Sequence, residues 1–336
     1  MNRIINRTYV CVMAVIFTVQ IVCLCGCSVS VQKKEDHPEK PKINVISMDD
    51  GSGEFRDEEY DDDEDEYDPD AEQGSYSAEE EAELPSQTPV ELDRDWEYAD
   101  YSAINSGSAV LHSAKDSRKN IVVAVNAGHG TKGGQNVKTY CHPDKSPKVT
   151  GGSTAEGSVK AAAVSSGMKF DDGTEEATAT LELARLFRDR LLEEGYDVLM
   201  LRDDTDVQLD NIARTVIANN TSDCMISIHW DGDDLDYDKG CFYISVPEEL
   251  KNMDPVSRYW AEHNRLGEAL IDGLRDRGCK IYDKGSMDVD LTQMSYSTIP
   301  SVDIEMGNQS SKRDEQMLDN YVEGLVLGVD SYFGSE

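Results

Sequence analysis

The sequence predicts an α/β fold: a single domain whose twisted, mostly parallel central sheet is flanked by helices. The first reason is that short apolar runs alternate with helix-length segments from about residue 119 onward, which is the element order of a sheet covered on both faces. The second is that residues 121–125 form a continuous apolar run, as in strands buried on both faces of a parallel sheet. The 336 residues could hold one large domain or two small ones.

The first expected strand covers residues 121–125, an unbroken apolar run. Residues 131–174 follow without a sustained period. A helix then begins at Glu175 and Glu176, acidic residues that suit the positive end of a helix, with Thr174 as its cap. Gly195 is expected to close this helix. Its buried face is expected to carry Leu183, Leu186, Phe187 and Leu191.

The remaining elements follow the same alternation. The expected strands are residues 196–201, 224–228, 240–246 and 302–304, and the expected helices are residues 210–219, 255–277 and 313–333. Helix 255–277 has an apolar face, and we expect His263 at its surface. Cys224 and Cys241 lie in apolar runs and are interpreted as small core residues.

Residues 28–115 are interpreted as an acidic disordered linker. They include the run DDDEDEYDPD and carry much of the net charge of −35, so this stretch is too charged and too poor in apolar side chains to fold alone. Acidity on this scale argues against nucleic-acid binding, which normally requires a basic surface.

The N-terminus indicates export. Arg3 and Arg7 precede a mainly apolar run over residues 9–27. Residues 24–28 (LCGCS) resemble the lipobox of bacterial lipoproteins, which implies cleavage before Cys27 and lipid attachment to its sulfur. An uncleaved signal anchor is the alternative, since the run is long enough to span a bilayer. Both interpretations predict an extracytoplasmic protein tethered to the outer face of the bacterial cytoplasmic membrane.

The other four cysteines, Cys141, Cys224, Cys241 and Cys279, show no CxxC spacing, so a structural zinc knuckle is not expected. An exported location permits a Cys141–Cys279 disulfide.

Four residues could bind or serve a metal. His129, His229 and Glu305 each end an apolar strand, and Glu176 opens a helix. Singly, each has an ordinary structural explanation. In an open α/β sheet, however, functional residues gather beyond the carboxyl ends of the strands, and two imidazoles with one carboxylate suit catalytic zinc.

Residues 121–307 resemble the catalytic domain of zinc-dependent N-acetylmuramoyl-L-alanine amidases of the type 3 family. The resemblance rests on residues 127–130 (AGHG), on Glu176 placed 19 residues before Gly195, on Arg202 and Arg214, on residues 227–229 (SIH) and on residues 300–307. It implies one Zn²⁺ per domain, held by His129, Glu176 and His229, with Glu305 as the catalytic residue. Glu175 competes with Glu176, but the helix register favours Glu176.

The chain departs from this family in two places. Trp230 and Asp231 stand where the family usually has Asn, and the interval between His129 and Glu176 is unusually long. The insertion, residues 131–174, is therefore expected over or beside the site. It is interpreted either as a substrate-binding flap or as a passive surface loop.

The resemblance implies cleavage of the amide between N-acetylmuramic acid and L-alanine of peptidoglycan, by zinc-activated water with Glu305 as general base and acid. Two alternatives stay open: a catalytically silent peptidoglycan-binding protein on the same fold, and a zinc peptidase acting on stem peptides. The expected division of the chain is a signal or lipoprotein segment (1–27), the linker (28–115) and a catalytic domain (116–336).

Overall fold

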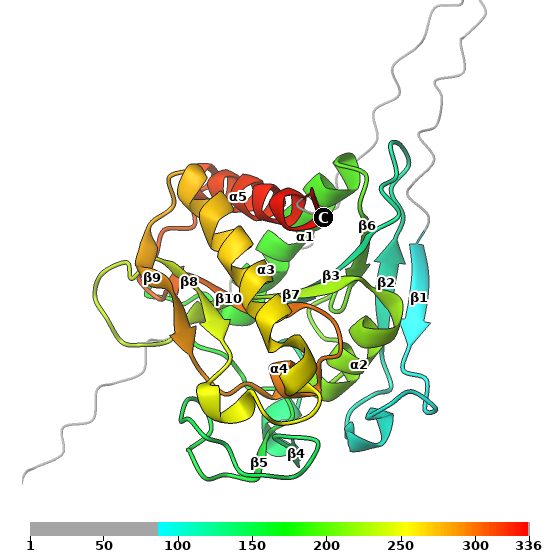
Figure 1. Ribbon diagram of the computed structural model, residues 1–336. Coiled ribbons are helices and arrows are strands. Elements are labelled where there is room, and N and C mark those ends of the chain that lie inside the picture. Colours follow the sequence, from blue (N-terminus) through cyan, green and yellow to red (C-terminus); the bar gives the residue numbers. More distant parts are fainter. Residues whose placement is uncertain (1–86, 335–336) are drawn as a thin grey trace, which may run out of the picture. The chain divides into compact units, whose positions relative to one another are not determined.

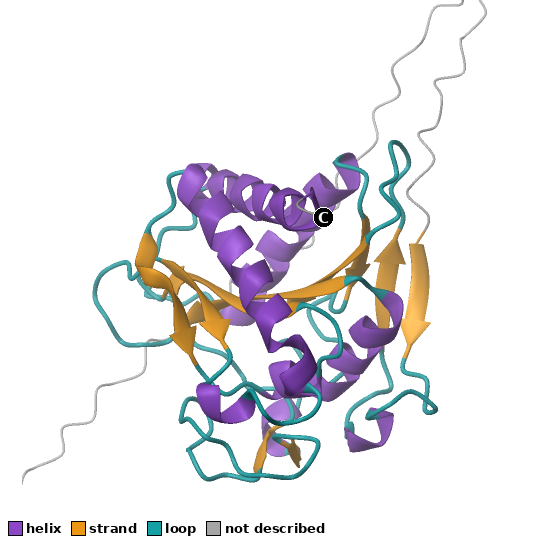
Figure 2. Cartoon of the chain, in the orientation of Figure 1, coloured by secondary structure: helices purple, strands orange, loops and turns teal. Residues whose placement is uncertain are grey.

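The computed structural model describes residues 87–334, which form a mixed α/β fold (Figures 1 and 2). Its main sheet has eight strands in the order β1-β2-β6-β3-β7-β10-β8-β9. The central pairs β6–β3, β3–β7 and β7–β10 are parallel, as is β8–β9, whereas β1–β2, β2–β6 and β10–β8 are antiparallel. The predicted fold class, a mostly parallel sheet flanked by helices, is confirmed.

The strands of the main sheet, in chain order, are β1 (Gln87–Glu91), β2 (Ser108–His112), β3 (Val122–Ala127), β6 (Asp197–Met200), β7 (Cys224–Asp231), β8 (Cys241–Ser245), β9 (Ile281–Asp288) and β10 (Ser301–Asn308). A second, antiparallel pair is formed by β4 (Lys138–Tyr140) and β5 (Lys160–Ala162). The α-helices are α1 (Glu176–Glu193), α2 (Asn211–Thr221), α3 (Val256–Asp276), α4 (Thr292–Tyr296) and α5 (Glu315–Gly334).

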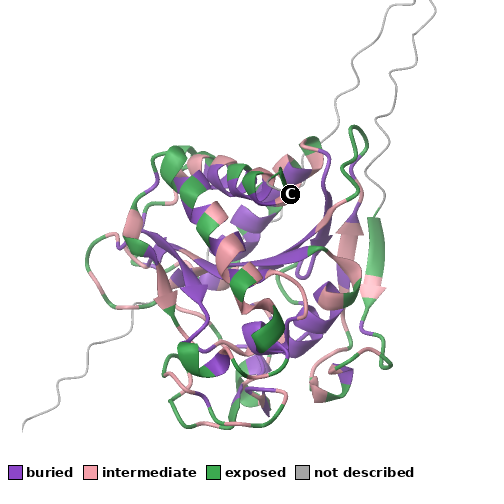
Figure 3. Cartoon of the chain, viewed as in Figure 1, coloured by how far each residue is buried: buried purple, intermediate pink, exposed green. Residues whose placement is uncertain are grey.

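Helices cover both faces of the sheet. Figure 1 shows α1, α3 and α5 on one side and α2 and α4 on the other. Figure 3 shows that the central strands between these layers are largely buried. The larger core joins α1, α3 and α5 to one face, and a second core joins α2 to the opposite face. The site must therefore lie at a strand end, because both faces are occupied.

Alternation along two central strands determines which side chains face the site. In β10, Val302, Ile304 and Met306 belong to the larger core. Successive side chains of a strand point to opposite faces, so Asp303 and Glu305 face the other way. In β7 the same alternation separates the core residues Ile226 and Ile228 from Ser227 and His229. His229 and Glu305 are direct register partners, so this pairing brings them together.

The linker boundary is corrected by the structure. Strands β1 and β2 fall within residues 28–115, yet they extend the sheet through antiparallel pairing. Leu92 and Ala99 are buried against α2 and its neighbours. Both strands are five residues long and only partly buried, so neither carries the long apolar run by which the other strands are predicted. The expected lipidation site Cys27, the signal segment and the acidic run lie outside the described residues.

Several local predictions are confirmed and others are wrong. Gly195 follows the end of α1 with a left-handed φ of 88°, and Cys224 and Cys241 are core residues, as predicted. Thr174 does not cap α1, because the helix begins at Glu176 and its N-cap is Glu175. Leu186 is 43% exposed instead of buried.

His263 is only 1% exposed, which contradicts its expected surface position. Its ring sits under the start of β10, where Nδ1 accepts a hydrogen bond from the amide of Ser301 at 2.9 Å. The cysteines Cys141, Cys224, Cys241 and Cys279 are buried free thiols, so the permitted Cys141–Cys279 disulfide is absent. Within residues 87–334, no helix combines the length and apolar character needed to cross a membrane.

The insertion, residues 131–174, is pinned to the body of the domain. Asp290, fully buried, lies 2.9 Å from Nε2 of His142 and accepts the amide of Val149 at 2.8 Å. Lys148 adds a contact from its ammonium group to the same carboxylate. A buried charge held by several donors is costly to release, so this part of the insertion is an integral part of the structure.

Candidate active site

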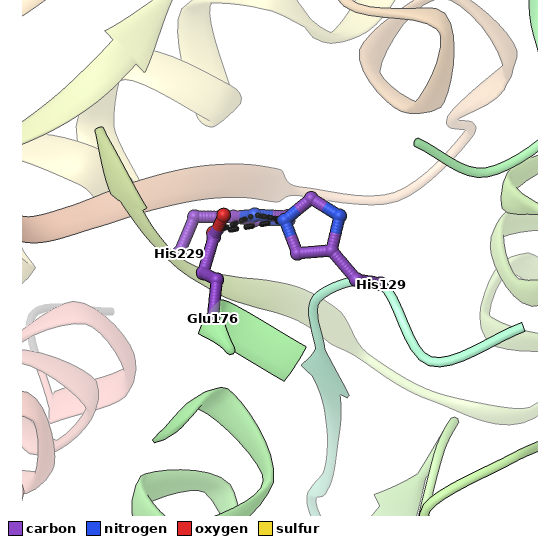
Figure 4. Close-up of side chains that lie close together, drawn as sticks. All are labelled: His129, Glu176 and His229. Atoms are coloured by element: carbon purple, nitrogen blue, oxygen red, sulfur yellow. Dashed lines mark hydrogen bonds and ion pairs between the residues drawn. The ribbon is translucent and has the colours of Figure 1, made fainter. Parts of the chain in front are cut away.

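Three of the four candidate residues converge on one point, as Figure 4 shows. Nε2 of His129 lies 2.8 Å from Oε1 of Glu176. Nδ1 of His229 lies 3.0 Å from the same oxygen and 3.1 Å from Nε2 of His129. Within the described part of the chain, this is the cluster whose donor atoms are arranged to hold a metal ion.

The elements that supply these side chains explain the convergence. His129 follows β3, Glu176 is the first residue of α1, and His229 lies near the end of β7. Strands β3 and β7 are parallel neighbours, so their carboxyl ends meet at one edge. Glu175 points elsewhere and pairs with Lys169. The geometry therefore favours Glu176 over its neighbour.

Burial and charge shift the acid–base behaviour of the cluster. Burial alone would raise the pKa of Glu176, but hydrogen bonds and charge from His129 and His229 lower it overall. Burial would lower the pKa of His229, yet the carboxylates of Asp303, Glu176 and Glu305 raise it to about 10. The carboxylate is therefore ionised at neutral pH and ready to act as an anionic ligand.

The turn that carries His129 requires its two glycines. A Cβ on Gly128 would lie 2.2 Å from Cε1 of His229, so the second histidine packs directly on this backbone. A Cβ on Gly130 would lie 2.6 Å from the side chain of Arg202, and its φ is 67°. His129 itself has a left-handed φ of 65°, a strained conformation of the kind found at functional sites. The close packing at this turn therefore requires glycine on both sides of His129.

Two buried arginines stabilise this turn from behind. Arg202 donates to the carbonyl of Ala127 at 3.0 Å and to that of Gly128 at 2.9 Å. Arg214 donates to the carbonyl of His129 at 2.7 Å. Burial lowers the pKa of Arg202 to about 10 and that of Arg214 to about 9, so both remain charged at neutral pH. Their fixed forks of donors satisfy backbone carbonyls that the turn leaves unpaired.

The last part of the insertion contacts the cluster. The carbonyl of Ser165 lies 2.9 Å from Nδ1 of His129, and the amide of Met168 donates to Oε2 of Glu176 at 2.9 Å. Gly167, between them, has a φ of 80°, and a Cβ there would lie 2.8 Å from Glu176. The insertion was expected over or beside the site, and its end does lie against the candidate ligands.

Glu305 is the fourth predicted residue. It is paired in register with His229, and its Oε2 is buried without a hydrogen-bond partner among residues 87–334. Burial raises the pKa of Glu305 well above its ordinary value, and the charge of His229 acts in the opposite direction. A carboxyl group with an elevated pKa can take and return a proton near neutral pH.

Sequence reasoning missed the residues that support the cluster. Ser165 and Met168 act through backbone atoms, which leave no mark in a sequence. Asp303 did leave a signal: it is a charged residue two positions before Glu305 in an otherwise apolar strand.

A family comparison agrees with this geometry. Residues 123–323 match the model of the family described as N-acetylmuramoyl-L-alanine amidase. The chain belongs to this amidase family. No curated protein sequence significantly matches that of this chain.

Two solved structures share the fold of the amidase. The first is the N-acetylmuramyl-L-alanine amidase Ami1 from Mycobacterium smegmatis, with 20% identity, a TM-score of 0.53, and coverage of 65% of this chain and 98% of that one. The second is the apo form of Ami1 from Mycobacterium abscessus, with 22% identity, a TM-score of 0.51, and coverage of 64% and 99%.

Family membership makes the chain a hydrolase acting on peptidoglycan, with N-acetylmuramoyl-L-alanine amidase activity. The two alternatives, a catalytically silent wall-binding protein and a stem-peptide peptidase, are not favoured.

Proposed function

We propose that the amidase uses one zinc ion, held by His129, Glu176 and His229, and that Glu305 transfers the proton from the attacking water to the leaving amine. The observation that carries this proposal is the triangle of donor atoms, whose edges measure 2.8, 3.0 and 3.1 Å. Zinc binds nitrogen and oxygen donors at roughly 2.0–2.1 Å in tetrahedral geometry, so adjacent ligand atoms lie about 3.3 Å apart. The residues therefore fit zinc with an adjustment of a few tenths of an ångström.

The chemistry of the donor set agrees with that fit. Two imidazoles and one carboxylate leave a fourth position of a tetrahedral ion for a non-protein ligand. When bound, a zinc ion of this kind supplies a Lewis acid that lowers the pKa of water and polarises a carbonyl.

Glu305 performs the proton transfer in this proposal. Its carboxylate accepts a proton from the attacking water as the water oxygen forms a bond to the lactyl carbonyl carbon. The carbon–nitrogen bond then breaks, and Glu305 returns the proton to the departing amine of L-alanine. The products are a free carboxylate on the glycan and a new amino terminus on the stem peptide.

Glu305→Gln tests the division of roles. This substitution should abolish the release of new L-alanine amino termini from purified peptidoglycan while bound zinc stays at one equivalent. Glu176→Gln should lose zinc as well as activity. Glu175→Gln is the matched control, because that neighbouring carboxylate is exposed and pairs with Lys169, and it should keep both. Near-normal turnover in Glu305→Gln would remove Glu305 from the mechanism.

We also propose that the enzyme is held outside the cytoplasmic membrane by lipid on Cys27 or by an uncleaved signal anchor. The basic residues Arg3 and Arg7, the apolar run and the lipobox-like residues 24–28 support this proposal. Labelled fatty acid should enter the wild-type chain and fail to enter Cys27→Ala. Membrane association without labelling in both chains would favour the signal anchor.

A further inference from the structure

A polar row crosses the sheet directly beneath the candidate ligands. Asn126 of β3, Ser227 of β7 and Asp303 of β10 are register partners on adjacent strands. Nδ2 of Asn126 donates to Oγ of Ser227 at 3.0 Å, and Oδ1 of Asn126 accepts a hydrogen bond from Arg214. Asp303 is the charged member of the row, and it faces the same side as His229 and Glu305.

Oδ1 of Asp303 is buried without a hydrogen-bond donor among the described residues. The residue as a whole is 7% exposed. An isolated buried carboxylate costs stability unless it is paired and hydrogen-bonded. A purely structural role would therefore be better served by an apolar residue, like its neighbours Val302 and Ile304.

The ring of His229 lies within ion-pair range of Asp303. Nε2 of His229 lies 3.7 Å from Oδ1 of Asp303, while Nδ1 of the same ring points at Glu176 and His129. The ring thus stands between the ligand cluster on one side and Asp303 on the other. Closure by about 0.5 Å would bring Nε2 and Oδ1 within hydrogen-bond range.

The second ring nitrogen of His129 is already within hydrogen-bond distance of an acceptor. Nε2 of His129 faces the cluster, and its Nδ1 lies 2.9 Å from the carbonyl oxygen of Ser165. Histidines that bind metals almost always donate their second ring N–H to a carboxylate or a carbonyl, which fixes the tautomer and the ring orientation. Ser165 fills that place behind His129, and Asp303 occupies it behind His229.

We propose that Asp303 is a positioning residue whose carboxylate accepts a hydrogen bond from Nε2–H of His229 and so keeps the Nδ1 lone pair directed at the metal. This inference rests on the proposed zinc site and adds to it a residue that touches neither the metal nor the substrate. In this proposal the carboxylate of Asp303 orients the ligand His229, and its burial lowers the stability of the fold.

The test compares zinc affinity with the stability of the metal-free chain. Asp303→Leu should weaken zinc binding about 10–100-fold, the usual effect of losing such a partner, measured by competition with a chelating dye. Asp303→Asn keeps an acceptor oxygen and should fall between wild type and Asp303→Leu. The melting temperature of metal-free Asp303→Leu should equal or exceed that of wild type, because a buried carboxylate oxygen without a hydrogen-bond donor is removed.

Asp197→Leu is the matched control. Asp197 is also a buried strand carboxylate, but it accepts hydrogen bonds from Ala114 and Arg118, so its loss should lower the melting temperature and leave zinc affinity unchanged. The ¹⁵N spectrum of the zinc form gives an independent measurement: the Nε2 proton of His229 should be held in wild type and exchange faster in Asp303→Leu.

Three outcomes would contradict the inference, and they are distinguishable. Wild-type zinc affinity in Asp303→Leu, with the wild-type chain binding one zinc, would overturn the role of Asp303 and leave the proposed function intact. A parallel loss of melting temperature and affinity would assign Asp303 a structural role instead. A wild-type chain that binds no zinc would overturn the proposed function together with this inference.

Discussion

Gly128→Ala is the most direct test of how the site is packed. The added methyl group would lie 2.2, 2.5 and 2.6 Å from three ring atoms of His229. The φ of Gly128 lies outside the left-handed range, so alanine suits the backbone there. The collision with His229 is therefore the sole expected source of damage.

The size of the effect follows from the contact distance. Ordinary contacts of a Cβ begin at 3.4 Å, so the ring of His229 must retreat by about 1.2 Å, or the turn must move by a similar amount. Inserting a methyl group into a packed site costs about 1–3 kcal/mol. A misplacement of about 1 Å in a catalytic constellation can cost on the order of 100-fold in rate.

The assay is release of L-alanine amino termini from peptidoglycan, together with zinc content and the melting temperature. Gly128→Ala should lose at least about 100-fold in kcat and bind zinc more weakly, with only a modest fall in melting temperature. Gly152→Ala is the control, because the nearest atom to its added methyl group lies 4.0 Å away, and it should match wild type. A folded Gly128→Ala enzyme with wild-type kcat and zinc affinity would show that His229 does not sit on this glycine.

Two further predictions concern buried polar groups outside the ligand cluster. Arg214→Met removes a guanidinium group that donates to five acceptors, including Asn126, His129 and Thr131. It should lower the free energy of unfolding, measured in urea, by at least about 3 kcal/mol, since each unsatisfied acceptor costs about 1–3 kcal/mol. The control is Arg258→Met at an exposed position, which should change this free energy by less than about 0.5 kcal/mol. Burial lowers the pKa of His263 from 6.5 to about 3, so the unfolded chain binds this proton first and stability falls by up to about 1.4 kcal/mol per pH unit as the pH drops from 6.5 toward 3. His263→Asn keeps an acceptor for Ser301 and should flatten this part of the profile, and an unchanged pH dependence would contradict the assignment.

The sequence was sufficient to predict the central sheet and the residues that meet at its edge. Strand β3 begins with a continuous apolar run and β7 is mostly apolar, patterns typical of buried parallel strands. Strand β10 instead alternates apolar residues with Asp303 and Glu305. His129 and His229 were identified because they follow such runs. Glu176 was separated from Glu175 by helix register alone, and the structure directs the two side chains to different places.

The parts that could not be predicted depend on long-range contacts. Strand β1 lies at the edge of the sheet and β2 lies between β1 and β6, and the burial of both strands is irregular, so their pairing cannot be predicted from composition. A polar side chain on an amphipathic helix is expected at the surface, yet the start of β10 buries the ring of His263. Ser165 contributes a carbonyl oxygen, which every residue has, so only the folded insertion reveals its position behind His129.

The site is held mainly by backbone contacts, and this explains why its ligands converge. The carbonyls of Ala127, Gly128 and His129 are fixed by two buried arginines, which keeps the strained turn in place. The ring of His229 rests on the same turn at Gly128. Both histidines are positioned by one rigid segment, so their donor atoms stay about 3 Å apart. Because these side chains are already ordered, binding a metal ion costs little conformational entropy. Glu305 requires no such clamp, because strand register alone places it beside His229.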